Sequence, residues 1–223
     1  MSIQLTLRHK QPIVGNAWSF IFEPSQPLAW TAGQFIRVEL PHAADIEGTT
    51  RYFTIASAPH EGHIQICTRL SHSTFKQALA QLPSGGVLQL INQPAGDFTW
   101  PHTQLHPVFV AQGIGITPFY SMIKQRLHGH QPLDATLLYT NLAGDTPFKP
   151  ELIEWQRNSQ LNVHLFNQPL SARHVAQAIP NLTATTIYVS GPQPLIELLM
   201  PPYNLPIGQL KQDTFPNYDA ANY

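Results

Sequence analysis

The chain has 223 residues, enough for one large domain or two small ones, and its 43% hydrophobic residues can build a substantial core. Only 11% of the residues are charged and the net charge is −1, so no basic run or stripe indicates a nucleic-acid partner. The single cysteine, Cys67, excludes an internal disulfide framework, a multi-cysteine zinc site and a self-supplied Cys₄ iron–sulfur cluster. The histidines show no metal-ligand spacing, so no metal site is predicted.

The N-terminus, MSIQLTLRHK, alternates like a strand and lacks the apolar core of a signal peptide. The longest apolar runs are far shorter than the ~20 residues that a membrane-spanning helix needs. We therefore expect no membrane segment and a cytoplasmic location.

The first part of the chain is typical of short strands separated by turns. Apolar residues alternate with polar ones, as at Trp18, Phe20 and Phe22, and helical spacing occurs only at residues 74–82. Many short strands with one helix predict an antiparallel barrel. The expected strands lie around residues 3–7, 18–22, 35–40, 51–55, 64–67 and 87–91.

After Trp100-Pro101 the pattern changes to strand, helix, strand, helix, which predicts a parallel sheet with right-handed crossovers. We expect one domain over residues 1–101 and an α/β domain over 102–223. The expected strands are 108–111, 135–139, 161–166 and 186–189, and the expected helices are 117–127, 150–157, 172–179 and 192–200.

The stretch RYFTIASAP, residues 51–59, combines strand-forming residues with an arginine and two hydroxyls. Arg51, Thr54 and Ser57 are either a solvated strand face or part of a site for a flat, anionic ligand. The residues of this stretch alone leave both readings open.

Two glycine sites follow strands of the second half. In VFVAQGIGITP, Gly113 and Gly115 precede Thr117, and in YVSGP, Ser190 precedes Gly191 and Pro192. Glycine allows a sharp turn and a close backbone approach, and the following helix start offers free N–H groups to a phosphate. Both sites are expected at the carboxyl edge of the sheet, where open α/β sheets bind ligands. A plain structural turn is the alternative at each site.

RYFTIASAP, GIGITP and YVSGP, in this order and at this spacing, resemble the ferredoxin–NADP⁺ reductase superfamily over about residues 2–218. The resemblance implies a flavin-binding antiparallel barrel followed by a nicotinamide-nucleotide domain, with hydride passing from nicotinamide to flavin N5. It also favours FAD over FMN as the bound cofactor, with NADH or NADPH as the substrate.

The resemblance implies roles for residues of the barrel. Arg51 would pair with the flavin phosphates, and the Thr54 hydroxyl would reach toward flavin N5. Phe53 stands where the family usually has tyrosine and would lie against the isoalloxazine ring or the ribityl chain. Tyr52 is also a candidate for cofactor binding, although strand alternation points its side chain away. A second phosphate element, ICTRLSHST, contributes Ile66, Cys67 and Thr68 as backbone neighbours and Ser73 and Thr74 as helix-start donors, with a plain helix cap as the alternative.

In the second domain the resemblance places nicotinamide near the two glycine sites. Ser190 replaces the cysteine that the family commonly has there. The loop after Tyr139, TNLAGD, has no arginine for a 2′-phosphate, which favours NADH, although Lys149 and Arg157 leave NADPH open. In the aromatic tail, KQDTFPNY, Asp213 stands where a carboxylate near the flavin is expected. Phe215, or else Tyr218, is expected to cover the flavin face; a tail packed on the surface is the alternative.

We therefore expect an FAD-dependent NAD(P)H oxidoreductase that passes electrons to an external acceptor: ferredoxin, flavodoxin or a small soluble molecule. The expected catalytic residues are Thr54, Ser190, Asp213 and Phe215. One alternative is a flavin-holding electron-transfer subunit of a larger complex, with weak or no nicotinamide activity. Another is a relative of the same fold that binds no flavin and serves as an interaction module.

Overall fold

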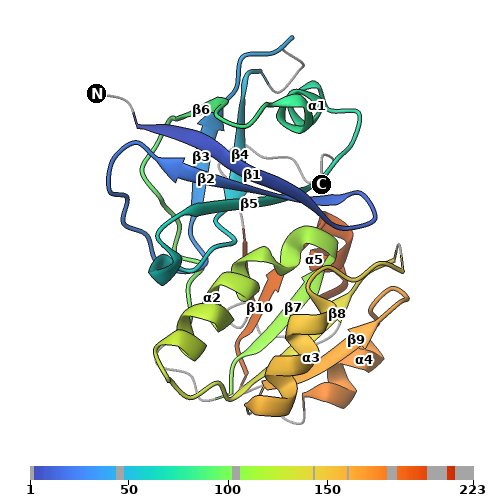
Figure 1. The fold of residues 1–223 in the computed structure, drawn as a ribbon. Coiled ribbons are helices and arrows are strands. Elements are labelled where there is room, and N and C mark those ends of the chain that lie inside the picture. Colours follow the sequence, from blue (N-terminus) through green and yellow to red (C-terminus); the bar gives the residue numbers. More distant parts are fainter. Residues whose placement is uncertain are drawn as a thin grey trace. The chain divides into compact units, whose positions relative to one another are not determined.

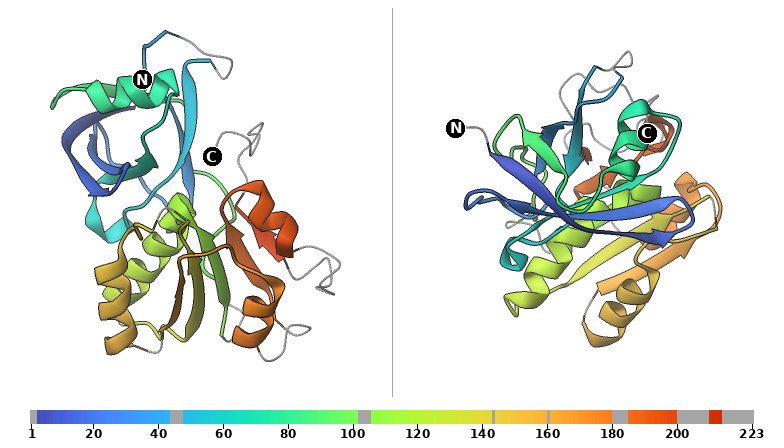
Figure 2. Two further views of the ribbon diagram at one scale, coloured as in Figure 1. Left: turned by 90° about the vertical axis from the view of Figure 1, so that its right-hand side faces the viewer. Right: turned by 45° about the horizontal axis from the view of Figure 1, so that its top comes forward.

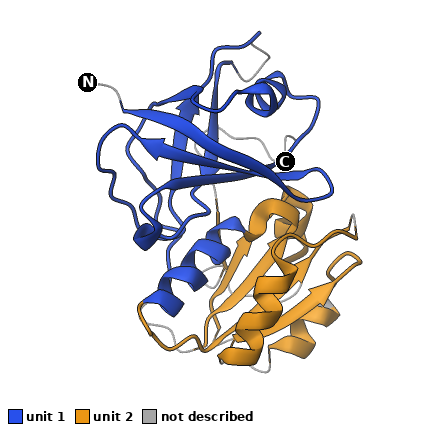
Figure 3. Cartoon of the chain, viewed as in Figure 1, with its two compact units in different colours: residues 1–100, 117–128 blue, residues 101–116, 129–223 orange. Residues whose placement is uncertain are grey.

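The computed structural model describes residues 3–43, 48–101, 106–142, 144–159, 161–179, 185–199 and 210–213. The chain forms two compact units, shown in Figure 3: residues 1–100 together with 117–128, and residues 101–116 together with 129–223. We describe each unit by itself. The domain division near residue 101 remains our proposal.

Among its described residues, the first unit has six antiparallel strands in the order β4-β3-β6-β1-β2-β5 (Figure 1). The outermost strands meet at a bridge between Ile55 and Ile66, beside which Ala56 N–H donates to the Gln65 carbonyl at 2.8 Å. The predicted antiparallel barrel is therefore confirmed. The strands are β1 Gln4–Val14, β2 Ala17–Pro24, β3 Phe35–Glu39, β4 Thr50–Thr54, β5 Ile64–Arg69 and β6 Val87–Leu90.

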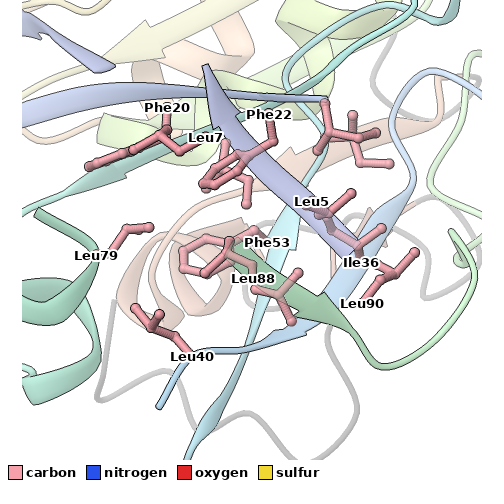
Figure 4. Close-up of a cluster of buried hydrophobic side chains, with 14 of the residues drawn as sticks. Leu5, Leu7, Phe20, Phe22, Ile36, Leu40, Phe53, Leu79, Leu88 and Leu90 are labelled. Carbon is pink, nitrogen blue, oxygen red and sulfur yellow. The ribbon is translucent and has the colours of Figure 1, made fainter. Parts of the chain in front are cut away.

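The core of this unit follows from the alternation of apolar residues along its strands. Side chains at every second position point inward, and Phe20, Phe22 and Ile36 are completely buried there. Phe75 and Leu79 of helix α1 (Thr74–Gln81) join the same cluster. Figure 4 shows part of this cluster.

Helix α2 (Thr117–His128) belongs to the same unit as the barrel. Its Ser121 hydroxyl donates to the Ser57 carbonyl at 2.7 Å, and Lys124 forms an ion pair with Glu61 of the short helix η1 (Pro59–Glu61). These contacts join segments more than sixty positions apart in the sequence.

In the part of the second unit that the structure describes, five parallel strands form a sheet in the order β11-β10-β7-β8-β9. Helix α3 lies on one face of the sheet and helices α4 and α5 lie on the other (Figure 2). The predicted strand–helix alternation is confirmed, and β11 is an additional strand that the sequence pattern did not predict. The elements are β7 Val108–Gln112, η2 Gly113–Ile116, β8 Ala135–Thr140, α3 Lys149–Asn158, β9 Leu161–Phe166, α4 Ala172–Ala178, β10 Ile187–Ser190, α5 Gln193–Leu199 and β11 Leu210–Gln212.

Candidate functional site

Strand β4 divides the predicted flavin residues between its two faces. Arg51 pairs in register with Val38 and Phe53 with Ile36, so both side chains point to the core side. Tyr52 pairs with Arg37 on the opposite face, and the Arg37 guanidinium lies 5.4 Å from the centre of its ring. The strand period therefore separates Tyr52 from Arg51, and the role of Tyr52 in cofactor binding stays a prediction.

Arg51 is a charged side chain that is only 5% exposed. Its Nη1 donates to the carbonyls of Gly48 at 3.0 Å and Thr50 at 2.8 Å, and its guanidinium lies 5.4 Å from the centre of the Phe75 ring. These contacts fix the guanidinium beside the start of helix α1. Because a buried guanidinium is favourable mainly opposite an anion, this placement suits a phosphate ligand.

Phe53 and Thr54 are also buried, with Thr54 7% exposed. The Phe53 ring lies 5.8 Å from that of Phe75, and Figure 4 shows it among the core side chains. The structure thus places Phe53 in the hydrophobic core of the barrel, and a contact with the flavin ring remains a prediction for both residues.

Strand β5 contributes Ile66, Cys67 and Thr68, all buried. Ile66 belongs to the barrel core. Burial raises the pKa of the Cys67 thiol to about 12. A hydrogen bond with Ser19 lowers this pKa, but by less than burial raises it. Since only the thiolate is a good nucleophile, Cys67 has the character of an inert core residue.

Ser73 is the residue that precedes helix α1, yet its side chain caps no helix N–H group. Its hydroxyl oxygen is buried and has no hydrogen-bond partner in the described part of the chain. A buried hydroxyl is normally hydrogen-bonded, so this group lacks a partner that a ligand would supply. Thr74 follows it as the first helical residue.

The surroundings of the Ser73 hydroxyl can be compared with the chemistry of a flavin nucleotide. A diphosphate supplies oxygen acceptors, and it is favoured both by the N–H groups at the start of a helix and by a nearby guanidinium. Arg51 and Ser73 are connected through Phe75, which contacts the guanidinium and lies two positions after Ser73. These residues fit the diphosphate of FAD.

Ser57, in contrast, has a structural role. Its hydroxyl donates to the His63 carbonyl at 2.7 Å and accepts from Gln65 N–H at 3.0 Å, which joins the end of the RYFTIASAP stretch to strand β5. Its carbonyl accepts from Ser121 and, at 3.3 Å, from the Trp30 indole. Spacing along the sequence gives no signal for these distant partners.

In the second unit, the first glycine site forms the short helix η2 directly after strand β7. A Cβ atom on Gly115 would lie 2.4 Å from the Ser190 carbonyl oxygen, so only glycine allows this approach to the end of β10. The Tyr139 hydroxyl donates to the Gly113 carbonyl at 2.8 Å and holds the turn. Tyr139 is a positioning residue that sequence reasoning missed.

Thr117, the next predicted residue, is buried as the first residue of α2.

The second glycine site lies at the end of β10. A Cβ atom on Gly191 would lie 2.8 Å from Leu195 Cδ2 and 3.1 Å from Gln112 Cβ, so the absence of a side chain keeps the ends of β7 and β10 close. Pro192 follows, and its carbonyl accepts from Leu195 N–H at the start of α5.

Strand β11 brings Asp213 to the same sheet edge. Asp213 N–H donates to the Val189 carbonyl at 2.9 Å, and the Ser190 hydroxyl donates to Asp213 Oδ2 at 3.2 Å. Both side chains are buried, at 1% for Ser190 and 6% for Asp213. The structure thus unites Gly115, Ser190, Gly191 and Asp213 within the second unit. Phe215 and Tyr218 lie outside the described residues.

Two polar side chains at the end of β8 and in the loop after it donate to main-chain carbonyls. Thr140 Oγ1 donates to the Gln168 carbonyl at 2.6 Å, and Asn141 Nδ2 donates to the Asp145 carbonyl. Both residues are buried. The described residues of this loop, 140–142, 144 and 145, include no cation.

Within the described part of the chain, no helix has the combination of length and apolar character required to cross a membrane.

Comparison with known proteins matches residues 109–200 to the oxidoreductase NAD-binding domain family. Methane monooxygenase component C of Methylosinus trichosporium is 30% identical over 138 residues, which cover 57% of this chain and 38% of that protein. The chain therefore spans well under half the length of this relative.

Solved structures share the fold over nearly the whole chain. The FAD/NAD-binding domain of nitric oxide dioxygenase from Vibrio cholerae aligns with a TM-score of 0.81 at 18% identity, covering 95% of this chain and 98% of that one. Ferredoxin–NADP⁺ reductase from Plasmodium falciparum aligns with a TM-score of 0.75 at 14% identity, covering 96% of each chain. The NAD-binding family match thus covers residues 109–200, and the chain shares its two-part fold with these solved structures.

Proposed function

We propose that the chain is a reductase that takes electrons from a reduced nicotinamide nucleotide and passes them, through bound FAD, to a separate acceptor. The observation on which this rests is the unpartnered, buried Ser73 hydroxyl at the start of α1, two positions before Phe75, whose ring contacts the buried Arg51 guanidinium. The superfamily fold and the NAD-binding match over residues 109–200 support the same function.

In this proposal Arg51, Ser73 and the N–H groups at the start of α1 hold the diphosphate of FAD. The flavin supplies the redox chemistry, because it accepts a hydride and releases electrons to an acceptor. The protein contributes binding and orientation. Gly115 and Gly191 keep the ends of β7 and β10 close together at the sheet edge where the nicotinamide nucleotide is expected to bind. The Ser190 hydroxyl, oriented by Asp213, is expected to contact the nucleotide.

We propose NADH as the preferred nucleotide. The Thr140 and Asn141 side chains of the loop after β8 donate to main-chain carbonyls, and its sequence, TNLAGD, contains no arginine or lysine to bind a 2′-phosphate. Lys149 and Arg157 are both exposed on helix α3 and remain the candidate cations for NADPH.

The acceptor is proposed to be a protein redox partner. Methane monooxygenase component C is named as one component of a larger oxygenase, which supports a role as a module within an electron-transfer system. A small soluble acceptor is the second candidate.

The direct test is the absorption spectrum of purified protein, before and after anaerobic addition of NADH. We expect flavin bands that bleach with NADH. Retained FAD that NADH does not bleach would favour the flavin-holding subunit, and failure to bind added FAD would contradict the proposal.

A further inference from the structure

His42 is a partly buried residue to which the predicted site assigns no role. It follows strand β3, and its Nδ1 lies 2.6 Å from the Leu40 carbonyl oxygen. Its ring meets the Phe75 ring edge-on, with centroids 5.3 Å apart. The other ring nitrogen, Nε2, is buried and has no hydrogen-bond partner among the described residues.

Phe75 connects His42 with the two residues that fit the diphosphate. The ring of Phe75 contacts His42 at one side and the Arg51 guanidinium at another, and it is completely buried. Ser73, two positions before Phe75 in the sequence, has a buried hydroxyl oxygen that is also unpartnered among the described residues. One ring therefore contacts both a buried cation and a histidine with an unpartnered nitrogen, and it follows an unpartnered hydroxyl by two positions.

The tautomer of His42 limits what Nε2 can bind. A carbonyl oxygen only accepts hydrogen bonds, so the short contact with Leu40 requires a proton on Nδ1. Nε2 then donates only when the ring is the imidazolium cation. An anionic ligand favours that form, and phosphate oxygens form strong, charge-assisted hydrogen bonds with it.

We propose that His42 Nε2 is a third protein ligand of the FAD diphosphate, beside Arg51 and Ser73. This inference rests on the proposed function and adds a residue that the RYFTIASAP and ICTRLSHST stretches do not contain. No bond forms or breaks in this role; His42 binds and orients the cofactor.

The test measures the dissociation constant for FAD in four proteins: the wild type, His42→Leu, His42→Gln and His63→Leu. Glutamine keeps an N–H donor near the position of Nε2. His63 is a matched control because its Nδ1 also contacts a carbonyl two positions earlier, that of Glu61, at 3.1 Å. Thermal unfolding of the FAD-free proteins shows whether each variant folds.

We expect His42→Leu to weaken FAD binding by about tenfold or more, the effect of one hydrogen bond to a charged group. His42→Gln should retain most of the affinity, and His63→Leu should match the wild type. An affinity for His42→Leu within about twofold of the wild type, ~0.4 kcal/mol, would overturn the proposal. Equal losses in the leucine and glutamine variants would also overturn it, because the loss would then come from packing.

A second measurement does not depend on the variants. In the imidazole ¹⁵N–¹H spectrum of the FAD complex, His42, assigned by its absence in His42→Gln, should show protons on both ring nitrogens. An unprotonated Nε2 in the complex would contradict phosphate binding by His42. If the wild type binds no FAD at all, the proposed function itself fails, which is a separate outcome.

Discussion

The hydroxyl of Ser190 donates a hydrogen bond to Asp213 Oδ2 over 3.2 Å, and both side chains are buried at the carboxyl edge of the parallel sheet. The bond joins the ends of strands β10 and β11, whose main chains are already paired. Because the carboxylate only accepts, it orients the Ser190 proton toward itself and leaves the hydroxyl oxygen able to accept from a ligand.

Asp213→Leu should lower the free energy of unfolding, because it leaves the buried Ser190 hydroxyl without its acceptor. The expected loss is about 1–3 kcal/mol. Asp213→Asn keeps an acceptor oxygen and should lose less. Urea unfolding of the three proteins measures the difference, and equal stability of the leucine variant and the wild type would show that the bond contributes nothing.

Ser190→Ala should slow the reduction of bound flavin by NADH while the FAD content stays unchanged. Loss of one contact that orients the nucleotide is expected to reduce the rate by up to about tenfold, ~1.4 kcal/mol of barrier. Anaerobic stopped-flow absorbance measures this rate. Ser84→Ala, at an exposed barrel turn, is the control; a similar loss of rate in both variants would remove the specific role of Ser190.

Arg51→Ala should weaken FAD binding by about 1.5–3 kcal/mol, the range for a hydrogen bond to a charged group. Arg37→Ala is a matched control, since Arg37 lies on the neighbouring strand but on the opposite face, where it donates to Thr50 Oγ1. Fluorescence titration with FAD compares the variants. Unchanged affinity in Arg51→Ala would contradict the assignment of this residue.

Most of the fold was predictable because its signals are local. Alternation such as Trp18, Phe20, Phe22 marks a half-buried strand, and the glycine pairs mark turns after strands. Strand alternation also indicated that Tyr52 points away from Arg51, as register with Arg37 confirms. These patterns need only neighbouring residues.

The features that the sequence did not predict depend on contacts between segments that are distant in the sequence. The short strand β11 has too few residues to show a period, and its pairing with β10 brings Asp213 to Ser190, 23 positions away. Ser121 binds Ser57 across 64 positions, and His42 meets Phe75 from another segment. Only the folded chain reveals these pairs.

NADH should reduce the flavin at least as well as NADPH, because Thr140 and Asn141 of the loop after β8 are bonded to carbonyls and the loop sequence has no arginine or lysine. Stopped-flow reduction over a range of each nucleotide gives both rate constants. A preference for NADPH of about tenfold or more, ~1.4 kcal/mol, would show that a cation elsewhere binds the 2′-phosphate. The variants Lys149→Ala and Arg157→Ala would then show which of these two cations binds the 2′-phosphate.

The buried thiol of Cys67 should make the stability of the chain fall at alkaline pH. Burial raises the folded-state pKa from 9.0 to about 12, so the folded protein keeps the thiol protonated while the unfolded chain releases the proton above pH 9. The stabilisation is therefore complete below the unfolded-state pKa and is lost progressively as pH rises from about 9 toward 12. Tyrosine and lysine residues also titrate in this range, so the wild type must be compared with Cys67→Ala. Urea unfolding at pH 8, 9 and ~10 should show a decline in the wild type that is steeper than in the variant. If stability declines with pH equally in both proteins, Cys67 is accessible to solvent. Rapid reaction of the native thiol with a disulfide reagent at pH 8 would independently show the same accessibility.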